Sequence, residues 1–407
     1  MPFDGASRRS QPSLPPTWRW VRLGDVCEET AGVRDPRSEP EKSFRYVDIT
    51  SVDNSAKRIV DPRTLLGGDA PSRARQVIRA GDVIVSTTRP NLNAVAMVPQ
   101  DLDGQVCSTG FCVLRAKEGL EPAYLFAFVR TAEFVQSLSN LVKGALYPAV
   151  TDKQVRDQVM PLPPLPEQER IAAILNEQMA AVEKARAAAE PRLEAAKGLL
   201  AAYLRATFDS QEIRRWPSES LGNVLQLRKE IVHPRDNPQG PATFVGLEHV
   251  ESITGRRIGS IDLEKAALTG RKPQFYTGDI VYGYLRPYLN KVWIGEFDGL
   301  CSVDQYVYSV DRDKAITEFV AWFMRSPGYL RSAPIDTTPG QLPRIRTEEV
   351  SSVEIHLPPL AEQERIVRTL KAQVDAAERV RKGVAEELAA IGALPAVLLK
   401  GAFSGEL

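Results

Sequence analysis

The sequence predicts an α+β protein in which two mixed α/β domains alternate with two long helices that pair as an antiparallel coiled coil. Three observations support this fold class: the chain is internally duplicated, short strand-like runs lie between the repeated motifs, and two segments are rich in strong helix formers. A chain of 407 residues with 43% hydrophobic residues is long enough to build two or three domains with cores of their own.

The duplication is clearest where residues 162–171 (LPPLPEQERI) recur as residues 357–366 (LPPLAEQERI), with nine of ten positions identical and an offset of 357 − 162 = 195. Further pairs follow in the same order at nearly the same offset: Trp18 and Trp216, Leu23-Gly24 and Leu221-Gly222, Gly81-Asp82 and Gly278-Asp279, Arg89-Pro90 and Arg286-Pro287, Asn93 and Asn290, Cys107-Ser108 and Cys301-Ser302, and Phe208 and Phe403. Seven matches in one order indicate a repeated architecture rather than chance.

The two copies diverge between these shared positions. Residues 50–80 share little with residues 248–277, and residues 131–152 share little with residues 325–347. One scaffold therefore carries two different surfaces, as expected of a protein that recognises two different targets with the same architecture.

Each copy has the same predicted order of elements. Short β-branched or aromatic runs bounded by Gly, Pro, Asp or Asn predict strands, and each copy then continues into one short amphipathic helix, at about 122–138 and about 315–330. The predicted strands are residues 44–49, 83–86, 94–98 and 111–114 in the first copy and 244–247, 280–284, 291–294 and 306–310 in the second. The expected division is a flexible N-terminus (1–16), a first mixed domain (17–160), a first helical spacer (161–210), a second mixed domain (211–356) and a second helical spacer (357–407).

The two spacers are predicted to be single long helices that begin near Pro166 and Ala361, just after consecutive prolines. Apolar residues recur in them at intervals of three and four, which makes a narrow apolar seam suited to a paired helix. A helix of about 40 residues is roughly 60 Å long. Pro191 in the first spacer, and Gly383, Gly392 and Pro395 in the second, predict a kink or a break.

Composition excludes several classes of protein. The net charge is zero, so a DNA surface must be a local patch or be completed by a partner. Cys27, Cys107, Cys112 and Cys301 have neither metal-ligand nor disulfide spacing, which predicts a reduced cytoplasmic setting. We expect no membrane-spanning segment, because no apolar run of about 18 residues is evident.

Catalytic motifs are also missing from the sequence. The three histidines, His233, His249 and His356, lie in unrelated contexts, so no metal site is expected. Neither a phosphate-binding GxxxxGK[ST] loop nor a GxGxxG dinucleotide motif is present. These absences favour a non-catalytic subunit.

Four features together resemble the specificity subunits of type I restriction-modification systems. They are the Trp-x-x-x-x-Leu-Gly opening of each copy, the Gly-Asp block followed by Arg-Pro, the Leu-Pro-Pro-Leu-x-Glu-Gln-Glu-Arg-Ile start of each long helix, and the ending at residues 401–407 (GAFSGEL). The resemblance extends from about residue 17 to residue 407. It is specific because the motifs occur together, in two copies and in the same order.

This resemblance implies two target recognition domains, each of which reads half of a split, asymmetric DNA site, with the long helices setting the distance between them. Two modification (methyltransferase) subunits and restriction (endonuclease) subunits are the implied partners. The chain itself would hold no cofactor, and S-adenosylmethionine, ATP and magnesium would be bound by the partners. A duplicated chain can also match the dyad symmetry of duplex DNA.

Candidate DNA contacts are basic, amide and aromatic residues, because Arg and Lys recognise guanine and Asn and Gln recognise adenine. The positions shared by both copies, Arg89 with Arg286 and Asn93 with Asn290, are expected to contact the DNA backbone or to hold the fold. Unshared residues such as Lys143, Tyr147, Gln341 and Arg344 are better candidates for base selection. The full set is Arg73, Arg75, Arg89, Asn91, Asn93, Lys143, Tyr147, Arg271, Lys272, Arg286, Tyr288, Asn290, Lys291, Gln341, Arg344 and Arg346.

Three other interpretations remain open at this stage. The chain could be the specificity subunit of a related restriction system whose partner fuses methylation with cleavage. It could be a coiled-coil scaffold that binds only proteins. It could also be a nuclease or methyltransferase that acts alone, which the missing motifs disfavour.

Overall fold

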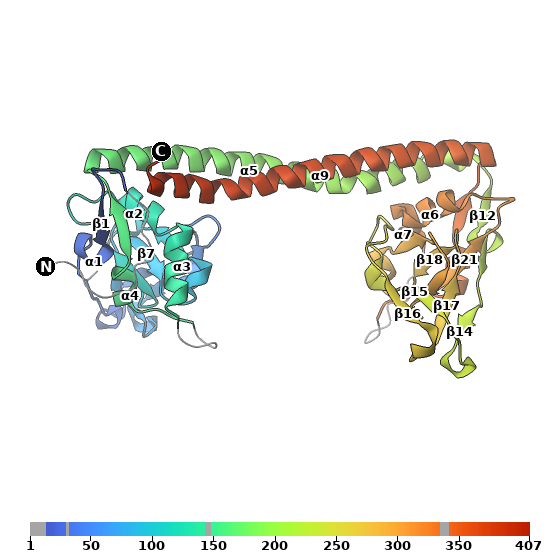
Figure 1. The fold of residues 1–407 in the computed structure, drawn as a ribbon, viewed down its shortest axis with the longest axis horizontal. Helices are drawn as coiled ribbons and strands as arrows, with labels where there is room; N and C mark the ends of the chain where they lie inside the picture. Colours follow the sequence, from blue (N-terminus) through green and yellow to red (C-terminus); the bar gives the residue numbers. More distant parts are fainter. Residues whose placement is uncertain (1–13, 30–31, 143–147, 334–341) are drawn as a thin grey trace. The chain divides into compact units, whose positions relative to one another are not determined.

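The computed structural model describes residues 14–29, 32–142, 148–333 and 342–407. The chain divides into two compact units (Figure 1). The first unit comprises Met1–Ala188 and Leu388–Leu407, and the second comprises Ala189–Glu387. Each unit therefore combines a globular part, called here the first or second domain, with the start of one long helix and the end of the other.

The described residues of the first domain form short strands and four α-helices. Its main sheets are a three-stranded antiparallel sheet in the order β10-β7-β8 and a four-stranded sheet in the order β5-β2-β9-β6, in which β2 and β9 are parallel. The elements are β1 (Arg19–Arg22), α1 (Leu23–Val26), β2 (Ser43–Val47), β3 (Val52–Asp53), β4 (Arg58–Ile59), β5 (Arg63–Leu66), β6 (Ala74–Val77), β7 (Val83–Ser86), β8 (Val95–Met97), β9 (Val106–Ser108), β10 (Phe111–Leu114), α2 (Pro122–Phe128), α3 (Ala132–Asn140), α4 (Asp152–Arg156) and β11 (Val159–Leu162).

The second domain repeats this plan with larger sheets, in the orders β13-β21-β18-β19 and β14-β17-β20-β15-β16. The parallel pair β15 and β20 corresponds to β2 and β9. The elements are β12 (Ser218–Ser220), β13 (Leu225–Leu227), β14 (Ile231–Val232), β15 (Pro241–Val245), β16 (Ile261–Glu264), β17 (Lys272–Phe275), β18 (Ile280–Gly283), β19 (Val292–Ile294), β20 (Gly299–Cys301), β21 (Gln305–Val310), α6 (Thr317–Arg325), α7 (Pro327–Ser332), α8 (Thr347–Ser352) and β22 (Glu354–His356).

Most predicted strands are present, but the prediction of one short helix per copy was wrong. Where one helix was predicted, the structure has two, α2 and α3 in the first copy and α6 and α7 in the second. Thr131 starts a new helix by accepting a hydrogen bond from the N–H of Phe134, and Ser326 does the same for Tyr329 before Pro327. Local capping thus overrides a continuous amphipathic pattern.

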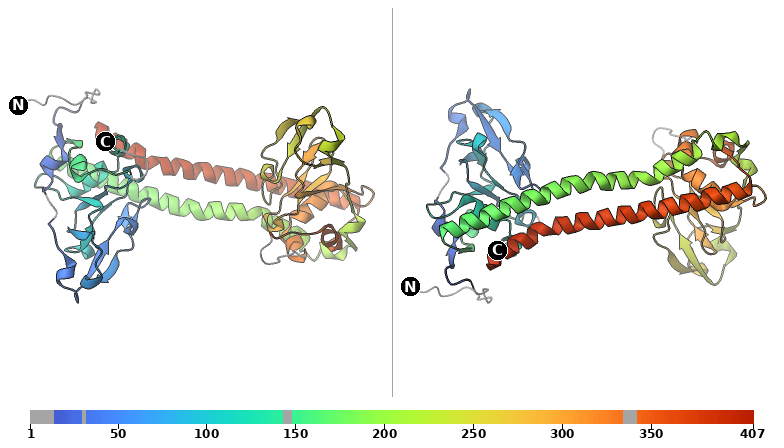
Figure 2. Two further views of the ribbon diagram at one scale, coloured as in Figure 1. Left: turned by 90° about the horizontal axis from the view of Figure 1, so that it is seen from below. Right: turned by 90° about the horizontal axis from the view of Figure 1, so that it is seen from above.

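The two long helices are α5 (Leu165–Phe208) and α9 (Leu360–Ser404). Of the predicted kink or break, the break is wrong, because α5 continues across Pro191 and α9 continues across Pro395 (Figures 1 and 2). The kink stays a prediction. A proline removes one backbone hydrogen bond, and in so long a helix the bonds on either side of it remain.

The expectation about apolar runs was also wrong, because one stretch of α9 is long and apolar enough to cross a membrane by length and composition alone. Leu399 and Ala402 of α9 pack in the core of the first unit.

A buried glutamine fixes the start of each long helix to its domain. The side chain of Gln168 donates to the carbonyl oxygens of Gly119 and Pro163 and accepts from the N–H of Glu121, at 2.9–3.1 Å. Gln363 makes the equivalent bonds in the second unit, with Lys314, Pro358 and Ile316. The glutamine of the repeated helix-start motif therefore ties the start of each long helix to its domain.

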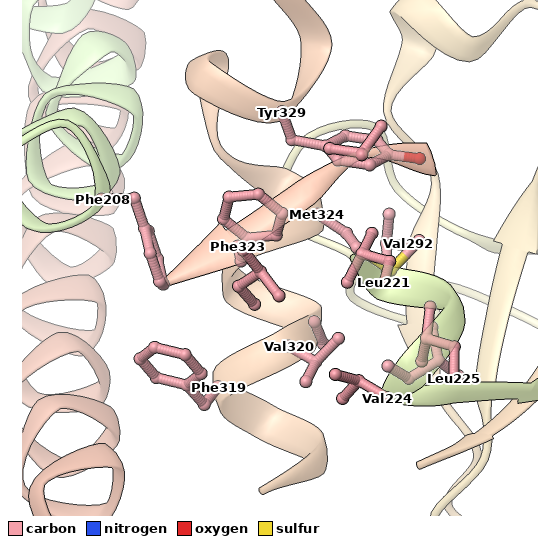
Figure 3. Close-up of a cluster of buried hydrophobic side chains, with 14 of the residues drawn as sticks. Phe208, Leu221, Val224, Leu225, Val292, Phe319, Val320, Phe323, Met324 and Tyr329 are labelled. Atoms are coloured by element: carbon pink, nitrogen blue, oxygen red, sulfur yellow. The ribbon is translucent and has the colours of Figure 1, made fainter. Parts of the chain in front are cut away.

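An aromatic side chain fixes the end of each long helix. Phe208 of α5 packs edge-on against Phe319 and Phe323 of α6, with ring centroids 5.4 and 5.7 Å apart (Figure 3). Phe403 of α9 packs edge-on against Phe128 of α2, with ring centroids 5.5 Å apart, and in a tilted arrangement against Tyr124, at 5.0 Å. Each domain is thus held both by the start of one long helix and by the end of the other, which firmly orients the domain within its unit.

Candidate nucleic-acid interface

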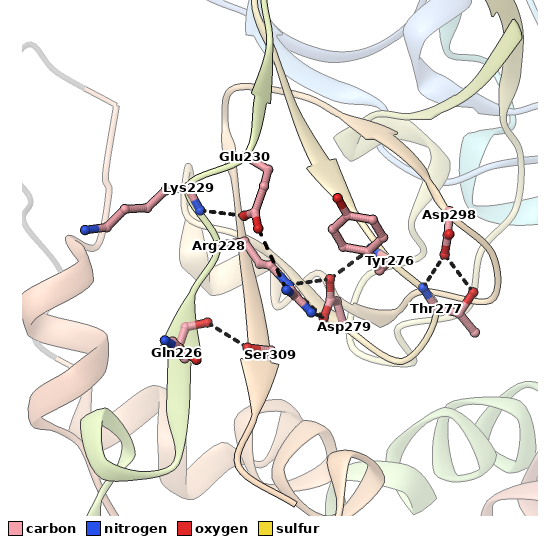
Figure 4. A network of polar contacts seen from close by, with 9 residues as sticks. All are labelled: Gln226, Arg228, Lys229, Glu230, Tyr276, Thr277, Asp279, Asp298 and Ser309. Carbon is pink, nitrogen blue, oxygen red and sulfur yellow. Dashed lines mark hydrogen bonds and ion pairs between the residues drawn. The ribbon is translucent and has the colours of Figure 1, made fainter.

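The shared Gly-Asp block supports the strand that leads into the candidate interface of each domain. Gly81 and Gly278 have left-handed backbone angles, with φ of 84° and 88°, which suit glycine. The following Asp82 is buried and receives two hydrogen bonds from Arg115, of 2.7 and 2.8 Å. Asp279 is likewise buried and is bound by Arg228 (Figure 4). These bonds raise the pKa of both arginines.

After this strand, each domain makes the same strained turn at its shared Arg-Pro motif. Short helical turns occupy Pro90–Leu92 and Pro287–Leu289. The residues on either side, Arg89 and Asn93 or Arg286 and Asn290, all have left-handed backbone angles, with φ between 46° and 53°. Asparagine tolerates this conformation, but arginine adopts it rarely, at a cost of about 1–3 kcal/mol. Such strain, present twice, points to a functional constraint on the turn, called here the Arg-Pro turn.

The Arg-Pro turn holds a segment that lies within a divergent part of each copy, residues 131–152 or residues 325–347. The N–H of Arg89 donates to the carbonyl oxygen of Pro148 at 2.8 Å, and Arg286 makes the same bond to Pro343 at 2.7 Å. Isolated bridges join Thr88 to Ala149 and Leu285 to Arg344. A constant turn therefore lies beside a variable segment in both domains, which is the arrangement expected of a scaffold that presents different recognition residues.

In the second domain, the turn lies next to two stacked tyrosines. The rings of Tyr284 and Tyr306 are 4.3 Å apart with planes 19° from parallel, and both side chains are half-buried. Burial raises the pKa of Tyr284, with a further increase from Asp304 and an opposing effect of Arg344 and Arg271. Burial also raises the pKa of Tyr306 to about 12. Both phenols therefore stay protonated near neutral pH and can donate hydrogen bonds.

The structure places the sequence-predicted residues in three groups. Exposed side chains are those of Arg73, Arg89, Asn91, Arg271, Arg286, Tyr288, Arg344 and Arg346. The side chains of Arg75, Lys272 and Lys291 contact their own domain: Arg75 pairs with Asp35, Lys272 lies over the ring of Phe244, and Lys291 donates to the carbonyl oxygen of Leu247. The buried side chain of Asn290 donates to the carbonyl oxygen of Arg325. Asn93 is half-buried, and its backbone carbonyl oxygen accepts from Lys57. Lys143, Tyr147 and Gln341 lie outside the described residues.

The structure brings together Arg286 and Arg344, which are far apart in sequence, through the turn and bridge described above. Sequence reasoning missed Tyr284 and Tyr306. Their signal was present, since aromatic residues alternate along both strands at 282, 284, 306 and 308, and alternation places side chains on one face.

The described residues contain no group of three or more His, Cys, Asp or Glu side chains able to hold a metal ion. All four cysteines are buried. Burial raises the pKa of Cys27 to about 11 and that of Cys112 and Cys301 to about 12, and it raises the pKa of Cys107 as well. These thiols remain protonated, so they are poor nucleophiles and poor metal ligands.

We expect Arg344→Ala to weaken specific duplex binding about 5- to 100-fold, the range for loss of an arginine that contacts DNA. Binding would be measured by fluorescence anisotropy at fixed salt, because phosphate contacts make affinity depend on salt. The matched control is Arg379→Ala, which removes an exposed arginine from α9, away from the Arg-Pro turn. Equal effects of the two substitutions would argue against a role for Arg344 in recognition.

Comparison with known proteins gives a consistent result. A family model described as the type I restriction modification DNA specificity domain matches residues 15–189. The specificity subunit of the type I restriction enzyme EcoDI from Escherichia coli is 27% identical over 305 residues, covering 67% of this chain and 68% of that protein.

Two solved structures are similar over almost the whole chain. The HsdS subunit from Thermoanaerobacter tengcongensis is 32% identical, with a TM-score of 0.67 and coverage of 98% of this chain and 99% of that one. A chain from a structural study of complex assembly and conformational transition in the type I restriction-modification system is also 32% identical, with a TM-score of 0.83 and coverage of 97% and 100%.

Proposed function

Because this chain belongs to the specificity subunits of type I restriction-modification systems, we propose that it recognises an asymmetric bipartite DNA target and directs its partner subunits to that target. The observation that carries the proposal is the pair of Arg-Pro turns. Their strained backbone is the same in both domains, but each lies beside a segment of different sequence. The same pose with different side chains suits two different half-sites.

The partners are two modification (methyltransferase) subunits and restriction (endonuclease and translocase) subunits, which join this chain in the cytoplasm. S-adenosylmethionine, ATP and magnesium are bound by those subunits. The role of this chain is recognition, in keeping with the naming of its relatives as specificity subunits. A local basic surface on a chain of zero net charge predicts weak DNA binding without the partners.

The long helices set the distance between the two half-sites by pairing as an antiparallel coiled coil. Contacts within the units support this pairing. In the second unit Arg192 of α5 hydrogen-bonds to Glu387 of α9 at 3.1 Å. In the first unit Arg170 near the start of α5 donates to the terminal carbonyl oxygen of Leu407, just beyond α9. The contact of Arg170 joins the start of α5 to the residue that follows the end of α9, which supports an antiparallel arrangement.

The test is reconstitution of the chain with its modification subunit, followed by methylation of a library of random duplexes. We expect methylation of one split motif with two unlike halves and a fixed gap. A complex that methylates without sequence preference would favour a protein-binding scaffold over a recognition subunit. Methylation or cleavage by the purified single chain would point instead to an enzyme that acts alone.

A further inference from the structure

The two long helices carry the same short motif at equivalent positions. Glu183 and Arg186 of α5 correspond to Glu378 and Arg381 of α9, at an offset of 195. In each unit this motif lies against one turn of the domain in that unit, formed by residues 53–57 in the first domain and residues 251–256 in the second. We call this turn the latch turn. It lies in one of the segments where the two copies diverge in sequence.

In the second unit the latch turn is held to α9 by ion pairs. Arg256 lies 3.4 Å from the carboxylate of Glu378 and 3.1 Å from that of Glu251. Glu378 also accepts two hydrogen bonds from Arg381. These bonds lower the pKa of Glu378, with the bond to Arg381 as the largest cause, so the carboxylate is charged at neutral pH. A four-member network of alternating charge therefore joins helix and domain.

The backbone of this latch turn cannot shift easily. Gly255 has a φ of 65°, and a Cβ atom placed on it would lie 1.9 Å from the carbonyl oxygen of Val292 and 2.4 Å from Nε of Arg325. Arg325 is itself buried and donates to the same Val292 oxygen at 2.9 Å. Only glycine fits in this close approach, so the turn is packed firmly onto the domain.

In the first unit the same position is held by different chemistry. The guanidinium of Arg186 donates to the hydroxyl of Ser55 at 3.1 Å. The carboxylate of Asp53 accepts from the backbone N–H groups of Ser55 and Ala56, at 2.8 and 2.9 Å. Lys57 has a left-handed backbone, with a φ of 53°, at the place that Gly255 takes in the second domain. In both units, the repeated motif of the long helix therefore contacts the latch turn, although the contacting side chains differ.

Each latch turn is bonded in turn to the Arg-Pro turn. The ammonium of Lys57 donates to the carbonyl oxygen of Asn93 at 2.6 Å. In the second domain the N–H of Ile253 donates to the carbonyl oxygen of Asn290 at 2.9 Å. Asn93 and Asn290 end the Arg-Pro turns, whose first residues bind the segments at 148 and 343. A continuous chain of contacts therefore runs from each long helix to its candidate DNA-binding turn.

We propose that Arg186, Arg256 and Glu378 are positioning residues that fix the orientation of each candidate DNA-binding turn on its long helix, and thereby sharpen discrimination between gap lengths. The inference rests on the proposed function. Both units join the long helix to the latch turn, but they do so with different side chains. This is expected if the contact between helix and turn, and not a particular side chain, is what function requires. The contacts do not touch the proposed base-reading residues, so the effect should fall on the gap and spare the half-site sequences.

The test uses the complex with the modification subunit and duplexes whose gap is native, one base pair longer or one base pair shorter. Glu378→Arg places a third positive charge beside Arg256 and Arg381. We expect the ratio of methylation rates on native and altered gaps to fall about three- to fivefold, the size typical of an exposed ion-pair network. The double variant Arg256→Glu with Glu378→Arg should restore most of the ratio.

The control is Lys382→Ala, the next residue after Arg381, whose partner Glu386 lies on the same helix. It should keep the wild-type ratio. If Glu378→Arg does not fold, Arg186→Ala tests the equivalent contact in the first unit. A wild-type ratio in either folded variant, or an altered preference for half-site bases, would overturn the inference. A wild-type complex without any sequence preference would instead overturn the proposed function.

Discussion

A chain that lacks residues 190–196 of α5 and residues 383–389 of α9 is expected to methylate a target with a shorter gap and to lose methylation of the native target by at least about 100-fold. Seven residues span about 10.5 Å of helix and two full turns, so the apolar seam stays in phase. Ten ångströms correspond to about three base pairs of rise, so the gap between the half-sites should shorten by at most about three base pairs. The blocks are chosen around the contact between Arg192 and Glu387.

The measurement is the methylation rate on a series of duplexes whose gaps decrease one base pair at a time. A control chain, in which the same two blocks are replaced by equal lengths with the same pattern of apolar and charged residues, should keep the native gap. If the shortened chain folds, binds the modification subunit and still prefers the native gap, the helices do not set the distance between half-sites.

Asp82→Ala is expected to lower the free energy of unfolding of the first domain by about 3–5 kcal/mol, because it leaves the guanidinium of Arg115 without its main buried partner. It also removes the acceptor for the N–H of Arg79. Asp279→Ala should have a comparable effect on the second domain through Arg228 and the N–H of Tyr276. Denaturation by urea, followed by a tryptophan or tyrosine signal from each domain, measures both effects.

The matched control is Asp101→Ala, which removes a carboxylate that pairs with Arg45 on the surface of the first domain. This exposed pair should contribute less than about 1 kcal/mol. Equal losses of stability for Asp82→Ala and Asp101→Ala would contradict the structural role assigned to the shared Gly-Asp block.

The duplication allowed much of this fold to be predicted from the sequence, because a motif seen twice reveals its own boundaries. The repeated helix-start motif marked where both long helices begin, while short β-branched or aromatic runs predicted the strands at 83–86 and 111–114. Finer divisions were missed where a single cap decided the outcome. Thr131 and Ser326 each start a new helix within a continuous amphipathic pattern.

The candidate interface was only partly predictable, because its residues come from distant parts of the chain. Arg286 and Arg344 were named separately, but only the fold joins them. Burial also separates residues of the same type: the side chain of Asn290 is enclosed, whereas that of Asn91 is exposed. The roles of Gln168 and Gln363 depend on backbone carbonyl oxygens, which a sequence does not reveal.

The measurement that tests the central claim most directly is the methylation pattern that this chain confers on DNA when it is expressed with its modification subunit in cells that lack other methyltransferases. We predict one motif with two unlike halves, separated by a fixed number of unread base pairs. Exchange of the second domain for that of another specificity subunit should replace one half and leave the other unchanged. Methylation of a continuous motif, or of no motif, would contradict the account.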